Sequence, residues 1–204
     1  MKLLDVRVLG DPILRRETTL VESVTDELRA FVADMFTTMY AAEGIGLAGP
    51  QVGRLERVCV IDVEGAKYTL VNPEIVEHGG SARAEEGCLS IPEIYGEVER
   101  PERVVVRALD LDGARIELQA DALLGRCIQH EVDHLHGKLF IDYLGLFKRR
   151  SALAEWDRLK EKYPGLIRKI VPGEVPSRRR GATTAASEAA EHATTHTPER
   201  TGEI

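Results

Sequence analysis

The chain has 204 residues, of which 43% are hydrophobic and 30% charged, and its formal net charge is -7. This balance is ordinary for a globular protein, and the negative charge disfavours proteins that coat DNA or anionic membranes. No apolar run approaches the length of a membrane span, and the N-terminal MKLLDVRVLGD lacks the apolar region of a signal peptide. Three cysteines without an export signal indicate a cytoplasmic protein with free or metal-bound thiols.

A helix is expected first. Apolar residues recur at three- and four-residue steps from Leu28 to Tyr40 and make one apolar face. Ser23 or Thr25 can cap the start of this helix, and Gly44 follows its end.

The middle of the chain is expected to form strands. Short runs rich in Val, Ile and Leu, broken by Gly, Pro and Asp, are typical of strands. They read RVCVIDV (57–63), YTLVNPEIV (68–76), RVVVRAL (103–109) and ARIELQA (114–120). Asp112 and Gly113 between the last two runs indicate a hairpin turn.

Two further helices are predicted after the strands. One runs from about Asp121 to His136 with Gly137 as its stop, and the other from about Arg149 to Tyr163. A helix, a meander of strands and then helices predict an α+β fold. In this fold mostly antiparallel strands pack around the helix at 121–136, with the other helices at the N-terminal and C-terminal ends.

The C-terminal stretch differs in composition from the rest. From residue 173 the chain is rich in Ala, Thr, Glu and Pro and has almost no large apolar residues. Such a segment cannot bury enough surface to offset the entropy of ordering it. We therefore expect residues 1–172 to form one domain and residues 173–204 to be a disordered tail.

A metal clamp is the clearest functional signal. QHEVDHLHG (129–137) places His130 and His134 four residues apart on one helix face, with Glu131 between them. Two histidines at the edge of a core are the plainer interpretation. The carboxylate at this spacing favours two metal ligands with a catalytic base beside them.

The third ligand decides the class of enzyme. A metzincin would have a histidine at position 140, where this chain has Phe140. A metalloendopeptidase with a downstream ligand could use Glu155 or Glu161, but their segment is highly charged and typical of a solvated helix face. A structural zinc module would be closed by a fourth Cys or His, and no recognisable motif supplies one.

The cysteines offer another ligand. Cys127 lies seven residues from His134, about 10.5 Å along a helix axis, whereas two ligands of one ion lie within roughly 4.5 Å of each other. Cys127 and Cys59 are therefore expected to be buried apolar residues. Cys88, in EEGCLSIPE, fits a metal ligand and a buried turn cysteine equally well on this stretch alone.

Three stretches together carry a resemblance to a known family. GIGLAGPQ (44–51), EGCLS (86–90) and QHEVDHLHG (129–137) resemble, in this order, the signature motifs of the peptide deformylase family. The first departs at Gly49, where the family usually has Ala, and the resemblance covers roughly residues 1–165. It implies a hydrolase that removes the formyl group from the N-terminal methionine of new polypeptides.

The resemblance also implies the parts of the site. Cys88, His130 and His134 would hold the metal with water in the fourth position, and Glu131 would be the acid and base. The side-chain amide of Gln51 and the backbone N–H of Leu89 would stabilise the oxyanion. An ion pair between Glu43 and Arg100 would support the first motif.

The substrate is expected to bind as an extended strand along residues 45–47, through main-chain hydrogen bonds. Arg126 stands at the rim of the expected methionine pocket, where the family often has an apolar residue. The expected substrate-binding residues are Ile45, Gly46, Leu47, Gly87, Leu123 and Cys127.

One divalent metal ion is expected as the cofactor. A thiolate with two imidazoles suits Zn(II) and Fe(II), and the resemblance favours Fe(II), with Zn(II) as the alternative. The expected partners are formyl-Met nascent polypeptides, with no DNA and no membrane. The basic run at residues 178–180 could add contacts to ribosomal RNA, and a solvated linker without a partner is an equal alternative.

Overall fold

The computed structural model describes residues 1–171. The predicted tail, residues 173–204, lies outside this part of the chain. Within the described part, no helix has the length and apolar character needed to cross a membrane.

Three α-helices occur where the sequence predicts them. They are α1 (Asp26–Ala41), α2 (Ala122–Leu135) and α3 (Leu146–Leu159). Thr25, and not Ser23, caps α1, because its hydroxyl accepts the Leu28 N–H at 3.2 Å. α2 ends as predicted, with Gly137 in the left-handed region just beyond it. α3 begins three residues before the predicted Arg149 and is followed by a short 3-10 turn at 160–162.

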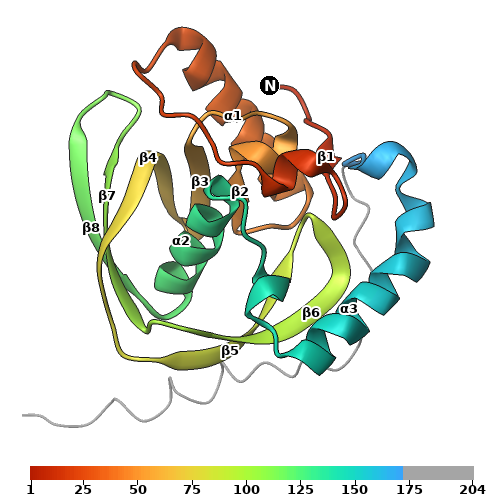
Figure 1. The fold of residues 1–204 in the computed structure, drawn as a ribbon. Helices are drawn as coiled ribbons and strands as arrows, with labels where there is room; N and C mark the ends of the chain where they lie inside the picture. The colour runs from red at the N-terminus through yellow and green to blue at the C-terminus, as the bar shows by residue number, and fades with distance from the viewer. Residues whose placement is uncertain (172–204) are drawn as a thin grey trace, which may run out of the picture.

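Within residues 1–171, nine strands form three antiparallel sheets. The five-stranded sheet has the order β2-β3-β4-β7-β8, β5 and β6 form a separate hairpin, and β1 pairs with β9 (Figure 1). Their bounds are β1 (Val6–Arg7), β2 (Gly46–Ala48), β3 (Val58–Val63), β4 (Ala66–Gly79), β5 (Ala82–Cys88), β6 (Ile91–Arg100), β7 (Arg103–Leu109), β8 (Arg115–Asp121) and β9 (Ile167–Arg168).

Both faces of the large sheet are covered near β3. Because side chains alternate along a strand, Cys59 and Ile61 join one apolar cluster with α2, whereas Val58 and Val60 join another with α1. α2 lies in the middle of the molecule with strands curving around it (Figure 1). This arrangement confirms the predicted α+β fold and places the His-Glu-x-x-His helix at its centre.

The β5–β6 hairpin was not among the predicted strands. Its segments, ARAEEGC and IPEIYGEVER, are rich in charge and carry few of the branched side chains that signal a strand. Ile91 and Val98 of β6 are nevertheless fully buried, in a third apolar cluster with α3. Packing on this cluster holds a hairpin that local composition does not predict.

Candidate metal centre

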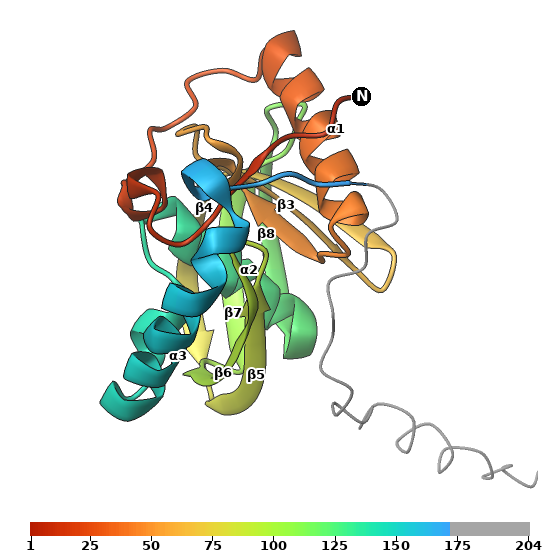
Figure 2. The same ribbon diagram turned by 90° about the vertical axis from the view of Figure 1, so that its right-hand side faces the viewer.

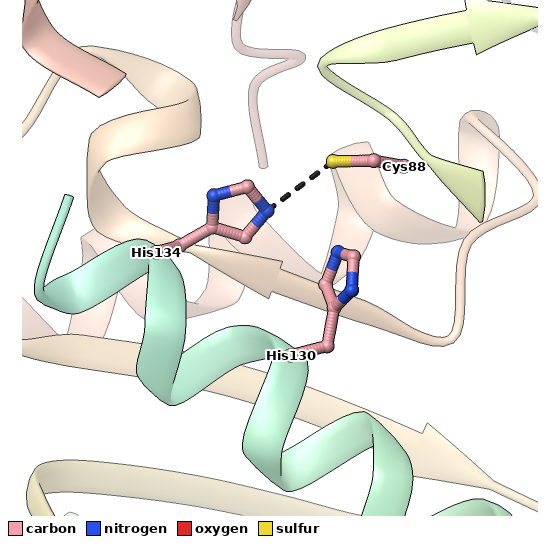
Figure 3. Close-up of side chains that lie close together, drawn as sticks. All are labelled: Cys88, His130 and His134. Carbon is pink, nitrogen blue, oxygen red and sulfur yellow. Dashed lines mark hydrogen bonds between the residues drawn. The ribbon is translucent and has the colours of Figure 1, made fainter. Parts of the chain in front are cut away.

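One helix and one hairpin bring three candidate metal ligands together. α2 carries His130 and His134 one turn apart, and both rings point toward the end of β5 (Figure 3). Cys88, the last residue of β5, places its Sγ 3.2 Å from His134 Nε2. The three ligand atoms lie within 4.8 Å of one another, and residues 1–171 contain no other such group of His, Cys, Asp or Glu. The charged C-terminal helix adds no ligand to the two histidines.

The donor set fits a divalent zinc or iron ion. One sulfur and two imidazole nitrogens are donors that both ions accept, and ligand atoms around one ion lie up to roughly 4.5 Å apart. Nδ1 of His130 lies 3.0 Å from Glu86 Oε2, which leaves Nε2 of that ring for an ion.

The electrostatics of the two rings also suit a cation. Burial acts to lower the pKa of His130, but Cys88 and Glu86 beside it raise that pKa well above its usual value. Surroundings that draw a proton onto His130 also favour a metal cation. Burial lowers the pKa of His134, which keeps this imidazole neutral, as a metal ligand must be.

A buried charge network holds His130 in place. Glu86 accepts hydrogen bonds from Arg100 Nε at 2.6 Å and from Arg126 Nη1 at 2.7 Å. Burial acts to raise the pKa of Glu86, but hydrogen bonds from His130 and Arg100 outweigh burial and lower the pKa to about 2. Glu86 is therefore ionised and fixes the orientation of the ring. The guanidinium of Arg126 turns into this network, although the residue also lines the cavity beside the metal centre.

The predicted ion pair between Glu43 and Arg100 is wrong. The guanidinium of Arg100 is buried and donates to Glu86 and, through Nη1, to Asp133 Oδ2 at 2.7 Å. Glu43 instead stands exposed in the turn after α1. Arg100 ends β6 close to α2, and its charge compensates the buried carboxylate of Glu86 and the half-buried one of Asp133.

The Arg100 network gives a stability prediction. Replacing Arg100 with glutamine leaves Glu86 and Asp133 without their shared cation, so the free energy of unfolding should fall by roughly 3–5 kcal/mol. Arg83 provides the matched control, because its ion pair with Glu99 is exposed. Arg83→Gln should leave the free energy of unfolding nearly unchanged, because water screens an exposed pair. Urea unfolding of both variants decides, and equal losses would contradict the assigned role of Arg100.

Glu131 lies beside the three candidate ligands and is not one of them. Its side chain is buried, and Oε2 has no hydrogen-bond partner among the described residues. Burial raises the pKa of Glu131 to about 7, although the charges of His130 and Arg100 act to lower it. A carboxyl group with such a pKa can both accept and donate a proton near neutral pH.

Gly46 leaves the space that Glu131 occupies. A methyl group at position 46 would lie 2.3 Å from Glu131 Oε1 and 2.8 Å from Cys127 Sγ. Gly46→Ala should displace the carboxylate and lower kcat at least ten-fold without loss of metal, because small misplacements of catalytic groups cost up to about 100-fold. At Gly145, where an added methyl meets no atom within 4 Å, the same substitution should leave kcat unchanged. A normal kcat in Gly46→Ala would indicate that Glu131 takes no part in the reaction.

Gln51 is fixed close to Cys88. It is buried, its Oε1 accepts the Ala48 N–H at 2.7 Å, and its Nε2 lies 3.5 Å from Cys88 Sγ and 3.3 Å from Ser90 Oγ. Because the oxygen is already bonded, the amide N–H group faces the candidate metal centre. Leu89 follows Cys88 directly, so its backbone N–H lies in the same turn.

A cavity of about 320 Å³ opens beside these groups. β2, at the edge of the five-stranded sheet, contributes one wall, and the β5–β6 hairpin contributes another. Leu47 does not line the cavity, because its side chain is fully buried in the cluster with α1. The expected substrate-binding residues that do line it are Ile45, Gly46, Gly87, Leu123 and Cys127.

The other two cysteines are buried, as the sequence predicts. Cys59 lies inside β3 and Cys127 inside α2, and burial raises the pKa of both thiols well above the usual value. Neither belongs to the group of candidate metal ligands.

Sequence reasoning missed the residues that support the ligands. Glu86 and Asp133 lie within the motifs, but no role was expected for either one. A signal was present for Glu86, because residues two positions apart on a strand project from the same face, and Glu86 stands two positions before Cys88. Both contact Arg100.

Comparison with known proteins finds one family. The family model described as "Polypeptide deformylase" matches residues 3–150. A peptide deformylase of Alkalilimnicola ehrlichii is 48% identical over 172 residues, which span 82% of this chain and 93% of that protein. The crystal structure of a peptide deformylase from Legionella pneumophila is 43% identical, with a TM-score of 0.75 over 80% of this chain and 100% of that one. A peptide deformylase from Synechococcus elongatus in complex with actinonin is 44% identical, with a TM-score of 0.73 over 82% and 91%.

Proposed function

The chain belongs to the peptide deformylase family and removes the formyl group from the N-terminal formyl-methionine of newly synthesised polypeptides, and we propose that it does so at the site of Cys88, His130 and His134. The observation that carries this assignment is the grouping of these three ligand atoms within 4.8 Å. Glu131 and a cavity of about 320 Å³ lie beside them.

The reaction depends on a metal ion, which these three residues would hold. When bound, a divalent ion supplies an activated water and polarises the formyl carbonyl group. We place Fe(II) first and Zn(II) second, because the donor set accepts both and the family resemblance favours iron. Metal analysis after anaerobic purification, with activity of the protein loaded with each metal, tests the choice.

The chain's own groups move the proton and hold the developing charge. The Glu131 carboxylate would accept a proton from the attacking water and pass it to the nitrogen of the leaving amine. The Gln51 amide and the Leu89 N–H would donate to the formyl oxygen as it becomes negative. The described residues offer no acceptor to the Leu89 N–H, which supports this role.

The substrate would bind along β2. β3 pairs with only one edge of β2, so the other edge is open to an added strand. Main-chain pairing there ignores most side chains, which suits an enzyme that acts on many nascent polypeptides. The methionine side chain would enter the apolar part of the cavity, between Ile45, Leu123 and Cys127.

The direct test is product analysis. Incubation of the metal-loaded protein with formyl-Met peptides should release formate and a free N-terminal amine in equal amounts. The acetyl-Met version of each peptide is the control for a larger acyl group. Cleavage inside the peptides without formate would instead indicate a metalloendopeptidase.

The domain boundary gives a further prediction. All proposed metal ligands and catalytic residues precede Gly137, so a protein that ends at Pro172 should fold and deformylate short peptides at the full-length rate. Lost activity would show that the boundary is misplaced.

Co-sedimentation of the full-length and the shortened protein with ribosomes, at low and moderate salt, tests the basic run at 178–180, because phosphate contacts weaken as salt rises. Equal binding by both proteins would remove residues 173–204 from the proposed cytoplasmic function.

A further inference from the structure

An arginine from the end of the described chain reaches the substrate cavity. Arg168 belongs to β9, which pairs with β1 (Figure 2), and it lines the same cavity as Cys88 and Glu131. The family match ends at residue 150. Arg168 therefore lies outside the residues that the family model matches.

The position of Arg168 is fixed by its neighbours. Arg168 stands opposite Val6 in the antiparallel pair, and residues directly opposite each other project from the same face. Val6 is fully buried, so this face points inward. Leu166 and Ile170, two residues to either side, pack against the apolar clusters. All three side chains are half-buried, and of the three only that of Arg168 lines the cavity.

Most N–H donors of the Arg168 guanidinium group have no partner among residues 1–171. Nη1 donates to Leu89 O at 3.4 Å, and among residues 1–171 no carboxylate pairs with it. A guanidinium has five N–H donors, so most of them remain available. Glu93, which also lines the cavity, is already paired with Lys162 at 2.8 Å. The cavity therefore contains a positive charge that the described residues do not neutralise.

We propose that Arg168 is a specificity-determining residue that favours formyl-Met polypeptides with a carboxylate shortly after the methionine. The inference rests on the deformylase function, because it concerns substrate residues that leave the site past Leu89. A guanidinium binds a carboxylate through two parallel hydrogen bonds. A half-buried guanidinium is also screened less by water than an exposed one.

The preference should be confined to one substrate position. Glu43 and Glu85 are exposed carboxylates that also line the cavity, and they would repel acidic residues near them. Arg168 contacts Leu89, so its effect belongs to the substrate residue that passes this turn. The carboxylate can be an Asp or Glu side chain or the C-terminus of a short peptide.

The test compares amidated formyl-Met peptides with Asp or Asn at the second, third or fourth position. At one position kcat/KM should be about three- to ten-fold higher for Asp, the range expected for a partly exposed ion pair. Arg168→Gln should abolish this ratio, and Arg168→Lys should keep part of it. Lys169→Gln removes a charge from an exposed neighbour on the same segment and should keep the full ratio. Free-acid and amidated tripeptides distinguish a C-terminal carboxylate from a side chain.

Two outcomes would overturn the inference. Equal rates for Asp and Asn at every position would remove any role of Arg168 in selectivity. An equal loss of kcat/KM for all peptides in Arg168→Gln would show that Arg168 only supports the Leu89 turn. Activity on neutral peptides tests the deformylase function separately. If Arg168→Gln does not fold, the wild-type Asp preference should still shrink as salt rises, and a salt-independent preference would count against an ion pair.

Discussion

Cys88→Ala should lose tight metal binding and, with it, essentially all deformylation. The expected effect is large because two imidazoles alone do not complete the set of three protein ligands that a catalytic site requires. Cys88 is also the one ligand that comes from outside α2, so no neighbouring residue of that helix can replace it. Metal content by mass spectrometry and formate release measure the two losses.

The other cysteines supply matched controls of the same chemical change. Cys59→Ala and Cys127→Ala each remove a buried thiol that is no part of the ligand group. Each should retain metal and cost roughly 0.5–3 kcal/mol of unfolding free energy. Full metal content in Cys88→Ala would contradict the site and reopen the search for a third ligand.

Glu131→Gln should keep the fold and the metal but lose about 10²–10⁴-fold in kcat, the usual share of a general acid and base. Glutamine has the same shape as glutamate, so the space next to Gly46 stays filled. Its amide cannot accept and return a proton. The measurements are metal content, thermal unfolding and kcat with a formyl-Met peptide.

Glu117→Gln is the control for Glu131→Gln. Glu117 carries an exposed carboxylate on β8, paired with Arg107, and the same substitution there should leave kcat unchanged. If Glu131→Gln loses its metal, Glu131 acts as a ligand or supports one. If kcat stays near normal, another group transfers the proton.

The sequence predicts the fold where apolar patterns are strong. α1, α2 and the strands β3, β4, β7 and β8 all carry periodic or continuous apolar residues, and all were expected. β1, β2 and β9 have two or three residues each, too few to carry a pattern. Their pairing depends on chain segments distant in sequence, which no local signal contains.

The residues of the site likewise fall into those that a local sequence pattern predicts and those that it does not. The spacing of His130 and His134 follows from helix geometry, whereas the stretch around Cys88 does not by itself predict a ligand, and only the three motifs together indicate one. The predicted partner of Arg100 is wrong because its actual partners are distant in sequence and come close to it only in the folded chain. The departure at Gly49 has a local cause, since a methyl group there would lie 2.8 Å from the carbonyl oxygen of Glu56.

The central position of α2 has a consequence for how the metal centre opens. Ile128, His134 and Leu135 are almost fully buried, so the amides around them should exchange with solvent only when the whole domain unfolds. Cys88 stands instead at the end of a strand in a two-stranded hairpin and lines the cavity, and backbone openings there should need less free energy. Two ligands thus belong to the slowest-exchanging part of the molecule and one to a faster part. Release of the ion should therefore begin with the thiolate, while the two imidazoles remain in place.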